Sequence, residues 1–277
     1  MVKGKREDKM EMDIKKVEGK GKKMEREKGN REKLFSTGDG EVLTAITIHF
    51  FTLFPQLVES YFHYSIMNRA LNRKLFQIKL INFRQFATNQ WKKVDTPVAG
   101  GGAGMVIDNS ALRNALVTYR QHYPDSRTIF LTPVGKPFTQ SDARRWSRER
   151  NIFLVAGRYE GFDERLIEDL AEEVISIGEY ILSGGELPAL VVADGILRNV
   201  PGVVGNQDSL KGESFGIGDG EYLLEAPNFS KMGSIPPILK SGNHQLIAQW
   251  RKKLALFKTQ FHTPFLLERT TDRNNSK

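Results

Sequence analysis

The stretch that decides the fold is Asn151–Leu170, which reads NIFLVAGRYEGFDERLIEDL. Its opening apolar run, which ends at Val155, is typical of a buried strand. Gly157 and Gly161 then mark a turn, and the residues from Asp163 onward show the helical spacing of apolar side chains. A buried strand, a glycine-rich turn and a helix form the repeating unit of an α/β domain with a parallel sheet.

The same alternation continues on both sides of this stretch. β-Branched and aromatic runs predict further strands, and apolar residues three or four apart predict the helices between them. The predicted strands are 46–54, 76–83, 128–132, 151–155 and 174–177, and the predicted helices are 56–75, 109–119, 140–150, 163–170 and 186–199. This alternation predicts an α/β fold with a largely parallel sheet. A later helical pattern at 247–261 predicts a small helical C-terminal domain.

Composition excludes several classes of protein. The chain has 277 residues and no cysteine, which excludes a disulfide framework, a thiolate zinc site and a cysteine nucleophile. No apolar run approaches 18 residues and the N-terminus is charged. We therefore expect no membrane span, no secretory signal and a cytoplasmic location. The P-loop, the dinucleotide-binding fingerprint and the HExxH zinc motif are also missing from the sequence.

Positive charge is concentrated at the two ends of the chain. Residues 1–40 carry a net charge of +4 and residues 226–277 a net charge of +7, whereas residues 41–225 carry −3. Basic ends favour a polyanionic partner, because clustered Lys and Arg release counterions from phosphates. Residues 1–44 have no apolar face, so we expect a disordered tail. A misassigned start, with Met24 in frame, and an RNA-tethering arm are the alternatives.

The C-terminal region has the composition of an RNA-binding surface. Between residues 226 and 267 there is no Asp or Glu. Basic and aromatic side chains are interleaved there: Lys231, Lys240, Arg251, Lys252, Lys253 and Lys258 with Phe229, His244, Trp250 and Phe261. In RNA, phosphates attract such cations and unstacked bases pack on such rings. The alternative is a basic helix whose aromatic side chains pack within the protein.

Three glycine-rich turns follow predicted strands. They are 132–135, 157–161 and 177–186. Open α/β sheets bind ligands at the carboxyl ends of their strands, where glycines let the backbone approach a ligand. Tyr159 and Tyr180 are available to pack on a flat ring, and the nine acids against two arginines in 157–186 favour a neutral or positive ligand. Taken singly, each turn is better explained as an ordinary tight turn, but the three together favour a small-molecule pocket.

Seven short motifs, in this order, resemble those of the bacterial tRNA (guanine-N1)-methyltransferases, which are of the knotted SPOUT class. The motifs are TLFP at 52–55, GGGAGM at 100–105, GRYEGFDER at 157–165, YILSGGELP at 180–188, PGVVG at 201–205, ESF at 213–215 and SGNH at 241–244. The resemblance covers roughly residues 46–265. It implies a trefoil knot in the α/β domain, against the usual rule that chains are unknotted.

The resemblance also implies an activity and the residues that carry it. A homodimer would transfer a methyl group from S-adenosylmethionine to N1 of the guanosine immediately 3′ of the tRNA anticodon. The residues implied for the cofactor are Leu131, Thr132, Pro133, Gly157, Tyr159, Glu160, Gly161, Ile177, Gly178, Glu179, Tyr180, Ile181, Leu182, Gly184, Gly185 and Pro188. Those implied for the substrate are Gly102, Gly104, Ser214, Glu225 and Asn228. Mg²⁺ is implied without assigned ligands.

Two further residues are implied for catalysis. Guanine N1 carries a proton that a base must remove as the methyl group arrives, and a donor must steady the charge that grows on O6. The resemblance assigns the base to Glu213 and the O6 partner to Arg198. Without it, Glu213 is one more loop acid and Arg198 is a cation that stabilises a helix C-terminus.

Several positions depart from the family pattern. Glu213 stands where the family has Asp, so the base is one methylene longer, and the stretch 216–221 lengthens the following loop. Asn228 and Phe229 replace a common His-Tyr pair, and Ala103 replaces a common Pro. We expect the chemistry to survive these changes, which bear mainly on recognition of the base.

The expected organisation has four parts. They are a charged tail at 1–44, a knotted methyltransferase domain at 45–203, a linker at 204–217 and a helical tRNA-binding domain at 218–277. Two rival functions keep the same fold: a methyltransferase that acts on another base, such as one in ribosomal RNA, and a non-catalytic RNA-binding protein. An enzyme unrelated to RNA leaves the acid-free region 226–267 without a role.

Overall fold

The computed structural model describes residues 35–36, 42–43, 45–205, 213–215 and 223–267. The chain divides into two compact units, Met1–Ala45 and Ile46–Lys277. In the first unit, β1 (Phe35–Ser36) pairs antiparallel with β2 (Val42–Leu43). The rest of the expected tail and most of the expected linker lie outside the described residues.

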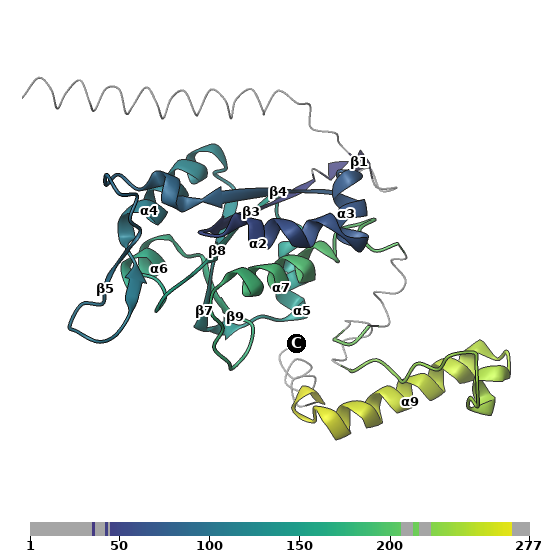
Figure 1. The fold of residues 1–277 in the computed structure, drawn as a ribbon. Coiled ribbons are helices and arrows are strands. Elements are labelled where there is room, and N and C mark those ends of the chain that lie inside the picture. The colour runs from purple at the N-terminus through teal and green to yellow at the C-terminus, as the bar shows by residue number, and fades with distance from the viewer. Residues whose placement is uncertain (1–34, 37–41, 44, 206–212, 216–222, 268–277) are drawn as a thin grey trace, which may run out of the picture. The chain divides into compact units, whose positions relative to one another are not determined.

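The second unit is built on a five-stranded sheet whose neighbouring strands are all parallel (Figure 1). The strands are β3 (Ile46–Thr52), β4 (Phe76–Asn82), β7 (Ser126–Pro137), β8 (Asn151–Ala156) and β9 (Glu173–Ser176). Their order across the sheet is β4-β3-β8-β7-β9. The predicted α/β class with a parallel sheet is confirmed, and the knot stays a prediction.

Helices connect the strands and continue into the C-terminal part. The α-helices are α2 (Pro55–Glu59), α3 (Ser65–Asn72), α4 (Asn109–His122), α5 (Gln140–Trp146), α6 (Glu164–Leu170), α7 (Glu186–Leu197) and α9 (His244–His262). Short 3₁₀ helices occur at Ser60–His63, Phe83–Phe86 and Pro237–Lys240. The predicted helical C-terminal part is confirmed by α9, although that helix begins before the predicted residue 247 and ends after 261.

The central strands are buried on both faces, because helices cover each side of the sheet (Figure 1). Side chains alternate along a strand, so Ile152 and Leu154 of β8 enter one core and Phe153 and Val155 enter the other. The first core is completed by α2, α3, α5 and α7, and the second by α4 and α6. This explains why the β8 segment reads as an unbroken apolar run.

The single helix predicted at 56–75 is wrong. The chain forms α2, a 3₁₀ turn and then α3, with an extended Tyr64 and a positive φ of 55° at Ser65. The break turns Phe62 and Met67 both toward the sheet, although their spacing of five residues does not fit one face of a helix. The prediction relied on Tyr61, among others, which the structure leaves exposed.

Two features of the sheet region were not predicted. The glycine-rich loop at 98–104 is carried by a hairpin of β5 (Asp95–Pro97) and β6 (Met105–Ile107). Strand β7 extends beyond the predicted 128–132, and it pairs with β9 in two steps, first through Leu131 and again from Lys136. The residues between these two points leave the ladder and form the first of the three predicted turns.

Glu173 ties the edge strand β9 to α5 and β7. Its carboxylate accepts hydrogen bonds from Arg145 Nη1 at 2.7 Å and Trp146 Nε1 at 2.9 Å, and Lys136 Nζ lies 2.9 Å away. Burial alone would raise the pKa of Glu173, but the hydrogen bonds from Arg145, Lys136 and Trp146 outweigh it and lower the pKa to about 2. The folded protein therefore favours the ionised carboxylate.

We predict that Glu173→Gln lowers the free energy of unfolding by about 2 kcal/mol at pH 7. This is less than for a fully buried pair, because Arg145 and Lys136 are half exposed. Since the folded pKa lies below the ordinary value of 4.5, the contribution is complete above about pH 4.5 and disappears as the pH falls towards 2.

Urea unfolding of the wild type and the variant at pH 7 and pH 3 measures this difference. Glu149→Gln is the control, because Glu149 contacts Arg127 alone among the partners found in the described residues. A stability difference that stays constant between the two pH values would contradict the role of the Glu173 charge.

Candidate active site

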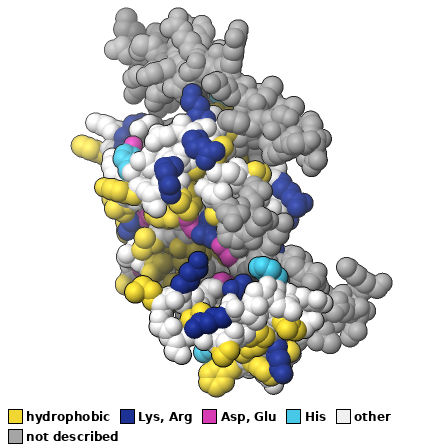
Figure 2. Space-filling model, turned by 90° about the vertical axis from the view of Figure 1, so that its right-hand side faces the viewer, with side chains coloured by type: hydrophobic (Ala, Val, Ile, Leu, Met, Phe, Trp, Pro, Cys, Tyr) yellow, Lys and Arg dark blue, Asp and Glu magenta, His cyan; other side chains and the backbone are white. Residues whose placement is uncertain are grey.

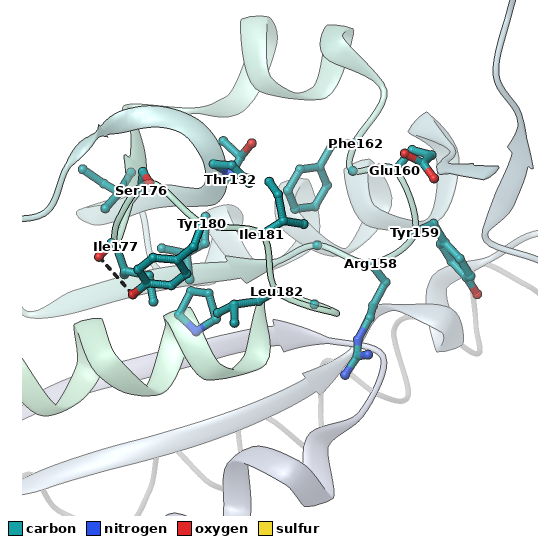
Figure 3. Close-up of a pocket in the computed structure, with 18 of the residues that line it drawn as sticks. Thr132, Arg158, Tyr159, Glu160, Phe162, Ser176, Ile177, Tyr180, Ile181 and Leu182 are labelled. Atoms are coloured by element: carbon teal, nitrogen blue, oxygen red, sulfur yellow. Dashed lines mark hydrogen bonds between the residues drawn. The ribbon is translucent and has the colours of Figure 1, made fainter. Parts of the chain in front are cut away.

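One pocket lies at the carboxyl ends of β7, β8 and β9 (Figure 3). It has a volume of about 220 Å³. Its lining residues are Leu131, Thr132, Pro133, Gly157, Arg158, Tyr159, Glu160, Gly161, Phe162, Ile175, Ser176, Ile177, Gly178, Tyr180, Ile181, Leu182, Gly184, Gly185 and Pro188. The three glycine-rich turns singled out in the sequence therefore meet at one edge of the sheet.

The structure brings together every residue expected to bind the cofactor except Glu179. Sequence reasoning missed four lining residues: Arg158, Phe162, Ile175 and Ser176. Arg158 and Phe162 lie within the GRYEGFDER motif, so the motif itself could have indicated that they line the pocket. Ile175 and Ser176 belong to β9, and only the pairing of β9 with the end of β7 shows that they reach the pocket.

Glycines allow the backbone segments around the pocket to touch. A Cβ on Gly185 would lie 2.6 Å from the backbone nitrogen of Gly157, and the Gly185 N–H donates to the Gly157 carbonyl at 2.7 Å. A Cβ on Gly135 would lie 2.5 Å from the nitrogen of Ile175. Larger residues at these positions would push the turns apart, so the glycines are required by close approach.

A buried carboxylate contacts the pocket-lining residue Arg158. Glu186, the first residue of α7, is 2% exposed, and its Oε1 accepts a hydrogen bond from Thr52 Oγ1 at 2.7 Å. Arg158 Nη2 lies 2.8 Å from Oε2 without forming an aligned hydrogen bond, so that contact is one of charge. Arg158 also donates to the Ser183 carbonyl at 3.0 Å and lies over the ring of Phe54. These contacts join three segments of the chain.

The pocket offers apolar and backbone surfaces to a ligand. Its walls combine apolar side chains, such as Leu131 and Ile181, with backbone N–H and C=O groups of the glycine turns. Tyr180 lies beside Gly178, where a Cβ would come within 2.3 Å of the ring, and its hydroxyl donates to the Ile177 carbonyl (Figure 3).

The glycine loop that carries Gly102 and Gly104 is attached to the pocket. The Ile107 N–H donates to the Gly161 carbonyl at 2.9 Å, and the Glu160 N–H donates to the Met105 carbonyl at 2.9 Å. The hairpin is thus hydrogen-bonded to the turn that follows β8. Two of the expected substrate residues therefore stand next to the expected cofactor residues.

The structure also brings the two expected catalytic residues together. Arg198 caps the C-terminus of α7, and its Nη2 donates to Glu213 Oε1 at 2.6 Å, with both side chains about one-third exposed. Neither residue lines the pocket. Pro188, which does, precedes Arg198 by ten residues of α7, a separation of about 15 Å along the helix.

The remaining expected substrate residues form a local cluster. The Glu225 N–H donates to Ser214 Oγ at 2.9 Å, and Asn228 Nδ2 donates to Glu225 Oε1 at 2.6 Å. Lys258 of α9 donates to the Glu225 carbonyl at 3.1 Å. Ser214 adjoins Glu213, so this cluster connects the expected base to the basic C-terminal helix.

Sequence reasoning missed one polar pair beside Arg198. Tyr61 donates to Asp194 Oδ1 at 2.7 Å, and Asp194 lies one helical turn before Arg198 on α7. Burial and this hydrogen bond raise the pKa of Tyr61 to about 12. Asp194 lies four residues before the predicted catalytic residue Arg198 on a predicted helix. This spacing could have indicated that the two side chains are neighbours.

The C-terminal helix α9 presents basic and apolar side chains together. Arg251, Lys253, Phe257 and Phe261 are exposed, whereas Trp250 packs against Phe229 with ring centres 6.2 Å apart. Some rings thus pack within the protein and others face solvent, and the binding of RNA by this helix stays a prediction. Figure 2 shows dark blue Lys and Arg side chains beside yellow hydrophobic ones on the face that it presents.

The described residues contain neither a metal-binding cluster nor a membrane-spanning helix. No cluster of three His, Cys, Asp or Glu side chains that could hold a metal ion occurs in that part of the chain, and the implied Mg²⁺ stays a prediction without assigned ligands. Within the same residues, no helix has both the length and the apolar character needed to cross a membrane.

Comparison with known proteins agrees with the geometry. The family described as "tRNA (Guanine-1)-methyltransferase TrmD" matches residues 46–269. A tRNA (guanine-N(1)-)-methyltransferase of Helicobacter hepaticus is 48% identical over 226 residues, which cover 79% of this chain and 91% of that protein. One of Nitratiruptor sp. is 48% identical over 78% of this chain and 96% of its own length.

A more distant relative shows the same coverage. The tRNA (guanine-N(1)-)-methyltransferase of Alcanivorax borkumensis is 42% identical over 231 residues, which cover 82% of this chain and 87% of that protein. The family match spans the parallel sheet, the pocket, the Arg198–Glu213 pair and α9. The chain therefore belongs to the tRNA (guanine-1)-methyltransferase family.

Proposed function

We propose that this tRNA (guanine-N1)-methyltransferase uses S-adenosylmethionine to methylate the guanosine immediately 3′ of the anticodon, with Glu213 as the base. The observation that carries the proposal is the contact of Arg198 with Glu213 at 2.6 Å. Guanine presents an N–H donor at N1 beside an acceptor at O6. A carboxylate and a guanidinium held side by side match that edge, one accepting and one donating.

Each side chain of the pair has one task in the reaction. Glu213 accepts the N1 proton, which leaves the lone pair of N1 free to attack. Arg198 donates to O6 and stabilises the negative charge that develops there as the proton leaves. Both groups are only one-third exposed, which reduces the screening of these charges by water.

The pocket supports the cofactor half of the proposal. S-adenosylmethionine supplies an electrophilic methyl group on a positively charged sulfur. We assign its adenosyl group to the apolar and backbone surfaces of Leu131, Gly157, Ile177 and Leu182, and its positive end to the side of the pocket that carries Glu160. The tight contact of Gly185 with Gly157 holds these surfaces in place before the cofactor arrives.

The C-terminal part supports the RNA half. Between residues 226 and 267 the chain has six Lys and Arg and no acid, and Phe257 and Phe261 are exposed on α9. We propose that this surface binds the tRNA and that Gly102, Gly104, Ser214, Glu225 and Asn228 contact the target nucleotide and its neighbours. We also propose that the activity is located in the cytoplasm, because its substrate is tRNA.

We predict that Glu213→Gln lowers kcat by about 10² to 10⁴, because an amide has no basic lone pair for the N1 proton. The affinity for S-adenosylmethionine should not change, since Glu213 does not line the pocket. Methyl transfer to a tRNA transcript and calorimetric titration with the cofactor measure the two effects separately.

Glu168→Gln is the control for this experiment. Glu168 lies on the exposed surface of α6, away from the pocket lining, so both measurements should match the wild type. A parallel loss of turnover and cofactor affinity in Glu213→Gln would show that Glu213 supports the pocket and would rule out its assignment as the base.

We also propose that the enzyme is a homodimer in which the Arg198–Glu213 pair serves the pocket of the partner subunit. Within one chain, about 15 Å of α7 separates Arg198 from the pocket-lining Pro188. An apolar patch surrounds that stretch, with Leu187 and Val191 of α7 60% and 49% exposed and Leu57 of α2 53% exposed. A second copy on this patch would bury apolar surface and bring in a second catalytic pair.

Leu187→Asp combined with Val191→Asp should convert the dimer to monomers and abolish methyl transfer, because two charges cannot be buried unpaired at an interface. Sedimentation velocity measures the oligomeric state. Val117→Asp is the matched control: Val117 is 42% exposed but lies on α4, which covers the other face of the sheet. A wild type that sediments as a monomer would contradict the proposal.

A further inference from the structure

A second acid-free stretch lies in the part of the chain that forms the sheet. Residues 60–94 contain seven Lys and Arg and no Asp or Glu, although residues 41–225 as a whole carry a net charge of −3. None of these seven cations forms an ion pair with another described residue. By contrast, Arg113, Arg120 and Arg145 on the following helices each contact a carboxylate. The positive charge of residues 60–94 is therefore available to a partner.

The last residues of this stretch form a turn that exposes an aromatic ring. In the turn 89–93, Trp91 is 83% exposed, and Lys92 and Lys93 beside it are exposed as well. Unpaired bases of RNA stack on such rings, and the phosphates between them attract neighbouring lysines. The composition of the turn thus matches a single-stranded segment of RNA.

Hydrogen bonds hold the turn in shape before any partner binds. Asn89 Nδ2 donates to the Lys93 carbonyl at 2.6 Å, and the Lys93 N–H donates to Asn89 Oδ1 at 2.8 Å. Arg84 Nη1 donates to the Lys92 carbonyl at 3.2 Å. These contacts use the backbone of the turn and leave the Trp91 ring outside. A turn that is already ordered loses little conformational entropy when it binds a ligand.

The turn stands at the edge of the sheet that carries the pocket. β4, β3 and β8 are parallel, and their carboxyl ends lie side by side. Only β3 separates β4 from β8, so the ends of these two strands are about 10 Å apart. The turn follows β4 and leads into β5, and the Asp108 N–H donates to the Val94 carbonyl at 2.9 Å. The turn is therefore joined to the hairpin that carries the glycine loop.

We propose that the turn 89–93 is a second RNA-binding surface, where Trp91 stacks on an unpaired base of the anticodon loop and Lys93 contacts a neighbouring phosphate. The proposal rests on the proposed methylation of tRNA beside the anticodon. When the target guanosine occupies the pocket, other nucleotides of the same loop lie at the same edge of the sheet. A membrane surface with anionic lipids also suits a ring between lysines, but it has no need of a place beside the pocket.

The test measures the binding of a labelled tRNA transcript by fluorescence anisotropy at several salt concentrations. Trp91→Ala should raise the dissociation constant about ten-fold, which is within the range for the loss of one base stack. Trp91→Phe should restore most of the affinity, because any base can stack on either ring. Lys93→Gln should reduce the slope of the logarithm of affinity against the logarithm of salt concentration by about 0.7, the contribution of one phosphate of a single strand.

Lys74→Gln is the matched control. Lys74 belongs to the same acid-free stretch, is exposed and has no ion pair among the described residues, but it precedes β4 at the opposite edge of the sheet, about 20 Å away along the strand. This variant should keep the wild-type affinity and salt slope. None of the three substituted residues lines the pocket, so an unchanged affinity for S-adenosylmethionine verifies that each variant is folded.

The outcomes separate this proposal from the proposed function. A wild-type affinity in Trp91→Ala, or a wild-type salt slope in Lys93→Gln, would overturn the proposal while the methyltransferase function stands. An equal loss of slope in Lys74→Gln would show a general effect of net charge and would also overturn it. Wild-type tRNA binding in Trp91→Ala, combined with a loss of binding to phosphatidylserine vesicles, would assign the turn to a lipid surface. Failure of the wild type to bind tRNA would instead overturn the proposed function, and the inference with it.

Discussion

The pocket depends on the buried carboxylate of Glu186. It joins the end of β3, through Thr52, to the turn after β8, through Arg158, and it begins the helix α7. Burial of a carboxylate is costly unless it is paired and hydrogen-bonded, so the three segments must come together for the charge to be tolerated. A carboxylate at the first turn of α7 is also favoured by the helix dipole. The same contacts hold Gly185 against Gly157, so two of the backbone segments that line the pocket lie in direct contact.

The two parts of the structure that are proposed to bind the tRNA substrate are connected to the pocket in different ways. The glycine loop is hydrogen-bonded directly to the pocket turn through Met105 and Ile107. The Arg198–Glu213 pair stands at the other end of α7 and connects through Ser214 and Glu225 to α9. The proposed cofactor site and the glycine loop are therefore hydrogen-bonded to each other, whereas the proposed base Glu213 is linked to the part that carries the basic surface. Because the Arg198–Glu213 pair lies at the far end of α7 from the pocket of its own chain, this arrangement favours an active site that is completed by a second subunit.

Sequence patterns predict the parts of this structure that are determined by residues close together in the sequence. The β8 run and its glycine turn were identified because burial on both faces demands apolar residues and the turn demands glycine. The helix at 56–75 was predicted wrongly because the break at Tyr64 and Ser65 serves tertiary packing of Phe62 and Met67. The β5–β6 hairpin was missed because three-residue strands carry almost no periodic signal. The contact between Glu213 and Arg198 could not be derived from spacing, since it joins a loop to the end of a helix, and the family resemblance alone indicated both residues.

The most direct test of the account is methyl incorporation into two tRNA transcripts that differ only in the nucleotide immediately 3′ of the anticodon. Labelled S-adenosylmethionine is offered with each transcript, one carrying guanosine and one carrying adenosine at that position. We expect label in the guanosine transcript alone, at N1 of that base, which establishes the cofactor, the substrate and the position in one experiment. Equal labelling of both transcripts, or of neither while the cofactor still binds, would contradict the proposed site of methylation.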